Sequence, residues 1–208
     1  MLAAQRARAL MLHGAVKPVL FGVLLLPFFW LLYATLTNQL GANPAEALIR
    51  ASGDWTLRAL CLVLALTPLR VLTATPALGR LRRMSGLFVY FYAVLHLLSY
   101  SGFDMGFELA DIAKDIAKRP FILVGFSAFV LLTLLAATSF NRAIRWLGGK
   151  RWQGLHRLVY VVSGLAMLHF FWMRAAKHNY AEVLVYAAIL ASLLGWRVIR
   201  FVKQRRSR

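Results

Sequence analysis

Six long apolar stretches constrain this chain more than any other feature of its sequence. They run over residues 17–37, 55–73, 86–101, 120–140, 154–173 and 182–202. Each is close to the roughly 20 residues that a helix needs to cross the hydrocarbon core of a bilayer, and the third is the shortest. The chain is 61% hydrophobic and only 15% charged, as polytopic membrane proteins are. We therefore predict an all-α integral membrane fold, a bundle of six transmembrane helices that forms one domain over residues 1–208.

The charged residues divide unequally between the two sides that six spans define. Of the 25 Lys and Arg residues, 18 lie in the N-terminal segment, the second and fourth connections, the C-terminal tail and their flanks. The other seven share the opposite side with all seven acidic residues. The positive-inside rule then predicts that both termini are cytoplasmic. This pattern excludes a nucleic-acid partner, because no basic soluble module carries the net charge of +18, and it favours contact with anionic lipid.

The connections carry the residues that end helices. Gly41-Ala-Asn-Pro44 opens the first outer connection, and residues 45–51 are predicted to form a short interfacial helix. Residues 103–118 alternate acidic, apolar and basic side chains, which fits either an amphipathic surface helix or a solvated loop. No internal repeat is evident, and no nucleotide-binding glycine motif is present. Electrons for any redox reaction must therefore come from a membrane donor or a separate protein.

Three of the five histidines lie inside apolar segments. His96 is in the third, whereas His156 and His169 share the fifth. An ionisable side chain in a bilayer costs about 2.5 kcal/mol or more and normally has a functional partner. By the predicted topology, His96 and His169 lie four or five residues below the outer surface on two different helices, and His156 lies near the inner surface. Two imidazoles at matched depth are typical of a haem held between helices of a bundle.

The same histidines are also compatible with simpler roles. A single intramembrane imidazole can bond a neighbouring backbone carbonyl, and His156, beside Arg157, could be solvated or bind a quinone head group. His156 and His169 are thirteen residues apart, about 140° around an ideal helix, and so do not share one stripe. The remaining two, His13 and His178, are expected to be solvated. A proton-coupled transporter with a histidine relay is a rival function, disfavoured because all seven acidic residues lie in or beside the outer connections.

Short stretches distributed from the first span to the fifth resemble the MsrQ family, the haem-binding membrane subunits of bacterial methionine sulfoxide reductase systems, within the ferric-reductase-like transmembrane superfamily. The matching stretches are Leu26-Pro-Phe-Phe-Trp30, Gly41-Ala-Asn-Pro44, Leu66-Thr-Pro-Leu-Arg70, Arg83-Met-Ser-Gly-Leu87, Leu95-His-Leu-Leu-Ser-Tyr100, Lys118-Arg-Pro120, Trp152-Gln-Gly-Leu-His156 and His169-Phe-Phe-Trp172. Their order along the chain makes the resemblance specific.

The resemblance implies an electron-transfer subunit of the bacterial inner membrane rather than a stand-alone enzyme. Such proteins take electrons from the quinone pool, or from a cytosolic flavin donor, and pass them through b-type haem. The acceptor is a periplasmic molybdopterin methionine sulfoxide reductase that repairs oxidised proteins. A transmembrane ferric or cupric reductase, which shares the fold, is the alternative.

The resemblance also assigns residues. By position, His96 and His169 match the family's haem ligands, and His156 matches its third functional histidine. His156 is therefore expected to be either a further ligand of haem iron, with a partner not identified, or part of the electron-donor site. The superfamily often pairs histidines on both helices, whereas Arg82 stands at the corresponding position here, fourteen residues before His96. One haem b is therefore expected, with a second left open. FMN is associated with the family, without residues to assign to it here.

Overall fold

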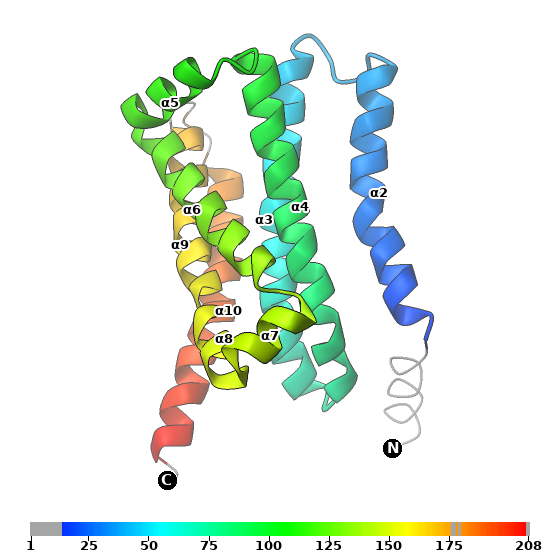
Figure 1. The fold of residues 1–208 in the computed structure, drawn as a ribbon, viewed down its shortest axis with the longest axis vertical. Coiled ribbons are helices and arrows are strands. Elements are labelled where there is room, and N and C mark those ends of the chain that lie inside the picture. The colour runs from blue at the N-terminus through cyan, green and yellow to red at the C-terminus, as the bar shows by residue number, and fades with distance from the viewer. Residues whose placement is uncertain (1–13, 176–177, 179, 207–208) are drawn as a thin grey trace. The chain divides into compact units, whose positions relative to one another are not determined.

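The computed structural model describes residues 14–175, 178 and 180–206, and all regular structure in these residues is helical (Figure 1). Six stretches are long and apolar enough to cross a membrane, namely Val16–Leu36, Pro44–Leu72, Pro76–Asp104, Pro120–Ala137, Gly149–Ala175 and Ala181–Arg206. The predicted all-helical membrane fold with six spans is confirmed. The chain divides into two compact units, Met1–Ser99 and Tyr100–Arg208.

The first unit consists of three spanning helices. Its elements are α2 (Val16–Leu36), α3 (Pro44–Leu72), the 3₁₀ helix η1 (Pro76–Leu81) and α4 (Arg82–Ser99). Helix α3 packs along α4, and α2 contacts both. Aromatic side chains join α2 to α4, because the ring of Phe21 meets that of Phe88 at 5.2 Å and Phe28 meets Phe91 at 5.4 Å. These edge-on contacts are a favoured geometry of aromatic pairs and hold the unit together.

Helix α2 continues through Pro27, the proline that the sequence places inside the first span. Proline has no N–H and removes one backbone hydrogen bond from the turn before it. In that turn the hydroxyl of Tyr92, which is 1% exposed, donates to the carbonyl of Leu24 at 2.7 Å. The carbonyl that proline leaves without its N–H donor is that of Val23, so the Tyr92 contact joins α4 to α2 beside the proline and does not replace the missing bond.

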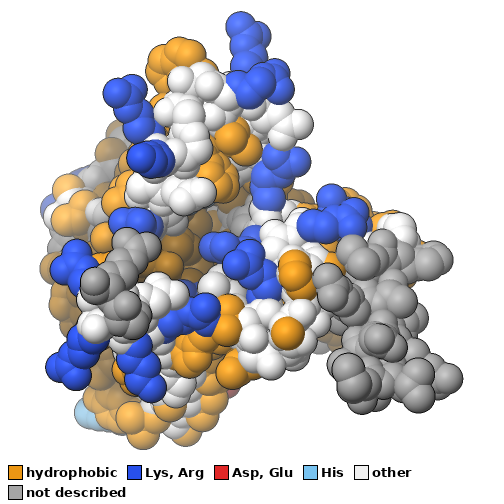
Figure 2. All heavy atoms as spheres, turned by 90° about the horizontal axis from the view of Figure 1, so that it is seen from below, with side chains coloured by type: hydrophobic (Ala, Val, Ile, Leu, Met, Phe, Trp, Pro, Cys, Tyr) orange, Lys and Arg blue, Asp and Glu red, His pale blue; other side chains and the backbone are white. Residues whose placement is uncertain are grey.

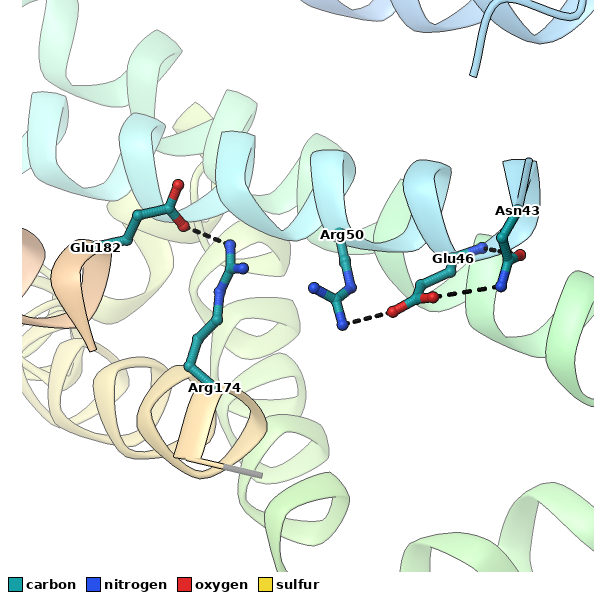
Figure 3. A network of polar contacts seen from close by, with 5 residues as sticks. All are labelled: Asn43, Glu46, Arg50, Arg174 and Glu182. Atoms are coloured by element: carbon teal, nitrogen blue, oxygen red, sulfur yellow. Dashed lines mark hydrogen bonds and ion pairs between the residues drawn. The ribbon is translucent and has the colours of Figure 1, made fainter. Parts of the chain in front are cut away.

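Helix α3 begins earlier than the sequence predicts. Residues 45–51, expected to form a separate interfacial helix, are the first turns of one continuous helix of 29 residues. Asn43 caps its start by accepting a hydrogen bond from the backbone N–H of Glu46 at 3.1 Å. The carboxylate of Glu46 pairs with Arg50 one turn later at 2.5 Å, as Figure 3 shows. These polar contacts explain the extension beyond the apolar stretch.

The second unit contains the other three spans and several short helices. Its elements are the π-helical turn η2 (Tyr100–Asp104), α5 (Leu109–Lys118), α6 (Pro120–Ala137), α7 (Asn141–Leu147), α8 (Gly149–Leu155), α9 (Leu158–Ala175) and α10 (Ala181–Arg206). Helix α6 packs along α9, which also contacts α10. Arg174 near the end of α9 pairs with Glu182 at the start of α10, in the other ion pair that Figure 3 draws.

The connection between the third and fourth spans contains a helix, α5, so residues 109–118 take the helical one of the two forms predicted for residues 103–118. Helix α5 is attached through Asp115, which accepts a hydrogen bond from the Tyr100 hydroxyl at 2.6 Å. The same carboxylate pairs with Arg119 at 2.8 Å. Asp115 therefore joins α5 to the turn η2 and to the start of α6.

The predicted fifth span over residues 154–173 is interrupted. Helix α8 ends at Leu155, the backbone of His156 forms its C-cap, and α9 begins at Leu158. His156 therefore lies in a turn and does not share a continuous helix with His169. The connection before it is basic and exposed, and Figure 2 shows many Lys and Arg side chains among hydrophobic ones on the face that it draws. The exposed basic residues of α7 and α8 are Arg142, Arg145, Lys150 and Arg151.

Candidate functional site

His96 is held by the backbone of the neighbouring helix in the first unit. It is half-buried near the C-terminal end of α4. Its Nδ1 lies 2.8 Å from the carbonyl oxygen of Ile49 on α3. Because a carbonyl oxygen only accepts, Nδ1 must carry the proton, and Nε2 then carries the lone pair of the neutral ring. This is the form of imidazole that binds a metal through Nε2, with the other nitrogen oriented by a hydrogen bond.

Two small residues of α3 lie against the His96 ring. A Cβ atom built on Gly53 would be 3.1 Å from both Nδ1 and Cε1 of His96. The hydroxyl of Ser52 is 3.5 Å from Nδ1, at the limit of a hydrogen bond. Ser52 is fully buried and bonds the carbonyls of its own helix, at 2.8 Å to Leu48 and 2.9 Å to Ile49. The Ile49 carbonyl is therefore the main partner of His96.

His169 has the same type of partner in the second unit. It is half-buried toward the C-terminal end of α9, and its Nδ1 lies 2.7 Å from the carbonyl oxygen of Phe121 on α6. The proton is again fixed on Nδ1 and the lone pair on Nε2. The ring of Phe121 also stacks on the imidazole, with centroids 6.0 Å apart. A Cβ atom built on Gly125 would lie only 2.7 Å from Nδ1 of His169.

His156 is held differently, through its other nitrogen. Its Nε2 lies 3.2 Å from the hydroxyl oxygen of Thr138, at the end of α6. That hydroxyl has a single proton, which its 2.8 Å contact with the carbonyl of Leu134 uses. The hydroxyl oxygen therefore accepts from His156, and Nε2 carries a proton. In this form Nε2 donates a hydrogen bond.

Trp152 completes the surroundings of His156. The indole ring of Trp152 lies over the imidazole, with ring centroids 4.0 Å apart. Its Nε1 donates to the carbonyl of Thr138 at 2.8 Å, so one residue of α6 bonds both rings. The indole ring and the Thr138 hydroxyl thus both contact His156, close to the basic connection of the second unit.

The remaining histidines are His13 and His178. His178 is exposed in a turn, and His13 lies outside the described residues. Within the part of the chain that the structure describes, no group of three or more His, Cys, Asp or Glu side chains could hold a metal ion. Two aromatic residues of the same helices belong to the buried core, since Phe88 in α4 and Phe170 in α9 are each 6% exposed.

The sequence predicted the three histidines and missed what positions two of them. Ile49, Gly53, Phe121 and Gly125 had no assigned role. A backbone carbonyl has no signature in sequence, and the only available signal was a lone glycine within a helical pattern, which often has a packing reason.

Comparison with known proteins identifies the family. The sequence model of the family described as "Ferric reductase like transmembrane component" matches residues 52–167, more than half of the chain. The protein-methionine-sulfoxide reductase heme-binding subunit MsrQ of Polaromonas naphthalenivorans is 73% identical over 188 residues, covering 90% of this chain and 86% of that protein. The chain belongs to the MsrQ family. The predicted family resemblance is confirmed.

Other relatives extend the comparison. The MsrQ subunit of Herminiimonas arsenicoxydans is 53% identical over 193 residues, 93% of this chain and 88% of that protein. Magnetosome protein MamZ of Magnetospirillum gryphiswaldense is 43% identical over 187 residues, which is 87% of this chain but 28% of that larger protein. No solved structure matches the chain. The region matched by the family model includes Gly53, His96, Gly125 and His156 and ends two residues before His169.

Proposed function

We propose that this member of the MsrQ family is a b-type haem electron-transfer subunit in which His96 and His169 would hold the haem iron. The observation that carries the proposal is the hydrogen bond from Nδ1 of each ring to a backbone carbonyl, 2.8 Å for His96 and 2.7 Å for His169. The names of its relatives, which are heme-binding subunits, support the same function. The residues present therefore fit the group that the family implies.

Each residue of these contacts has a defined task in the mechanism. The carbonyls of Ile49 and Phe121 fix the tautomer and the orientation of the two imidazole rings. Because each carbonyl accepts a hydrogen bond from Nδ1–H, Nε2 of the same ring becomes a stronger electron donor to a metal. The half-buried positions limit access of water to both rings. A haem held by both imidazoles would supply one-electron transfer.

We assign His156 to the side of the protein where electrons enter. Its protonated Nε2 and the indole of Trp152 suit a quinone or flavin head group, which offers carbonyl oxygens and a flat ring. The alternative role as ligand of a second haem would require Nε2 to lose its proton and its contact with Thr138. The exposed Arg82 gives such a haem no second imidazole on α4, so we propose one haem.

The remaining parts of the proposal concern topology and partners. We propose a single domain in the bacterial inner membrane with both termini cytoplasmic, which agrees with the exposed basic residues of α7 and α8. This prediction also counts Arg6, Arg8, Lys177 and Arg208, which lie outside the described residues. Electrons would come from the quinone pool or a cytosolic flavin donor. The relatives' names mention heme and no flavin, so FMN stays a prediction.

The acceptor is proposed from the relatives' names, which contain "protein-methionine-sulfoxide reductase". A periplasmic molybdopterin enzyme that reduces methionine sulfoxide in damaged proteins would receive the electrons. The description of the matching family, which contains "ferric reductase", favours one alternative, reduction of external ferric or cupric ions.

A reoxidation experiment distinguishes the two acceptors. Purified full-length protein is loaded with haem, reduced with dithionite and mixed with either a methionine sulfoxide reductase subunit of a related bacterium or chelated ferric iron. We expect a reduced Soret spectrum in the wild type and rapid reoxidation by the reductase subunit only in the presence of methionine sulfoxide. Reoxidation by chelated iron alone would support the metal reductase, and a colourless protein after expression with ample haem would overturn both.

A further inference from the structure

The two units contain the same local arrangement around their histidines. In each, an imidazole toward the C-terminal end of a spanning helix donates through Nδ1 to a carbonyl near the start of a neighbouring helix, and a glycine follows that carbonyl four residues later. The carbonyl and glycine are Ile49 and Gly53 in α3, and Phe121 and Gly125 in α6. The carbonyl precedes its histidine by 47 residues in the first unit and 48 in the second. The sequences around the two glycines are unrelated, which is why no repeat is visible without the structure.

We propose that Gly53 and Gly125 are positioning residues, whose missing side chains let His96 and His169 reach these carbonyls and direct Nε2 toward the haem iron. This inference rests on the proposed function, because it assumes that both histidines are ligands. Neither glycine would touch the haem iron. Each acts only through the imidazole beside it.

Helix geometry explains why the glycine is four residues after the carbonyl. In an α-helix the carbonyl of residue i already accepts from the N–H of residue i+4, and the two side chains lie on the same face. The imidazole is a further donor to that oxygen and must reach it from the side, across residue i+4. A side chain there stands in the path of the ring, and glycine alone has none.

The distances give the two glycines different tolerances. An added Cβ at Gly125 would lie 2.7 Å from Nδ1, 2.9 Å from Cε1 and 3.1 Å from Cγ of His169. Optimal separation of non-bonded heavy atoms is about 3.5–4.0 Å, so the ring must move. The clash involves the bonded nitrogen and the atom that attaches the ring to its stem, and moving them breaks the contact with Phe121. At Gly53 the corresponding distances are 3.1 Å to Nδ1 and to Cε1 of His96, which a shift of a few tenths of an ångström relieves.

Other glycines in spanning helices serve as matched controls. Gly22 in α2 and Gly195 in α10 have no atom within 4 Å of an added Cβ. Both are helical, and neither is beside a histidine. Each unit therefore has one control position, at which replacing glycine by alanine makes the same chemical change without displacing an imidazole.

The experiment compares four alanine variants of the full-length protein purified with ample haem: G125A, G53A, G22A and G195A. Three quantities are measured: protein in the membrane, haem per polypeptide by pyridine haemochrome, and the g-values of the oxidised haem by EPR. We expect G125A to lower haem affinity about 10–100-fold, as loss of an outer-shell partner does. G53A should retain more haem, with shifted g-values, and both controls should match the wild type.

The outcomes separate this inference from the proposed function. If H96A and H169A retain wild-type haem, the proposed function fails whatever the glycine variants do. If both histidine variants lose haem while G125A and G53A keep wild-type content and g-values, the positioning role alone is wrong. Should G125A be absent from the membrane, G53A decides, because a shifted EPR signal at normal protein level supports the inference and an unchanged one overturns it.

Discussion

His96 and His169 differ from His156 in the nitrogen that the protein holds. The first two donate through Nδ1 to the carbonyls of Ile49 and Phe121, whereas His156 donates through Nε2 to the hydroxyl of Thr138. A carbonyl partner on Nδ1 leaves the lone pair on Nε2, the nitrogen farther from the backbone and better able to reach a large group. The three histidines in apolar segments are therefore held in two different tautomers. The tautomer of His96 and His169 suits metal binding through Nε2, and that of His156 suits hydrogen-bond donation from Nε2.

Removing each imidazole gives the largest expected effect and tests the division directly. In H96A and H169A we expect haem affinity to fall by more than about 100-fold, since outer-shell changes alone cost about 10–100-fold. In H156A the haem content should equal that of the wild type. Pyridine haemochrome assays of the three purified variants check this. Equal haem loss in all three variants would abolish the distinction.

Replacing Thr138 by valine tests the hydroxyl partner of His156 with little change of shape. T138V removes the acceptor of the Nε2 proton but leaves both proposed haem ligands untouched. We expect the haem content to be unchanged. Quinol should reduce the haem about fivefold more slowly, because the loss of one hydrogen bond of about 1 kcal/mol corresponds to a factor of about five in rate. Stopped-flow absorbance at the Soret band measures the rate. A loss of haem in T138V would instead assign His156 to the ligands.

A smaller effect is expected from W152F. Phenylalanine keeps an aromatic ring over His156 and removes the Nε1 donor to the Thr138 carbonyl. Because the direct contact of His156 with Thr138 remains, quinol reduction should slow by no more than about twofold, a fraction of one hydrogen bond. The same stopped-flow assay applies, with haem content as the control. An effect exceeding that of T138V would make the indole, rather than the hydroxyl, the main partner.

The smallest effect is expected from S52A, which compares the two carbonyl-bonded histidines with each other. His96 has the Ser52 hydroxyl 3.5 Å from Nδ1, whereas His169 has the stacked ring of Phe121. A contact at 3.5 Å adds little to the 2.8 Å bond with Ile49. Haem content and EPR g-values should be those of the wild type. A clear shift in g-values would make Ser52 a second determinant of His96.

The sequence was sufficient for the spanning helices, because length and hydropathy alone define them in a bilayer. It failed where polar contacts extend or interrupt a helix. The start of α3 was missed because Glu46 and Arg50 break the apolar pattern, although the Asn43-Pro44 cap was a usable signal. The turn at His156 was missed because the contacts of Trp152 and His156 with Thr138 join segments 14 and 18 residues apart.

The site was predictable in part for a similar reason. The histidines are visible because an ionisable residue is conspicuous among apolar ones. Their tautomers depend on partners that sequence does not reveal, since any residue can supply the carbonyl that Ile49 and Phe121 supply. Gly53 and Gly125 resemble the other helical glycines until the distance to a neighbouring ring is known. The matched depth of His96 and His169, and the cytoplasmic termini, stay predictions.

The central claim is that His96 and His169 both ligate one haem through Nε2. EPR of the oxidised, purified wild-type protein tests it most directly, because two axial imidazoles produce low-spin ferric haem. We expect a single low-spin signal that accounts for one haem per polypeptide and disappears in H96A and in H169A. A high-spin signal in the wild type, or a low-spin signal that survives either substitution, would contradict the claim.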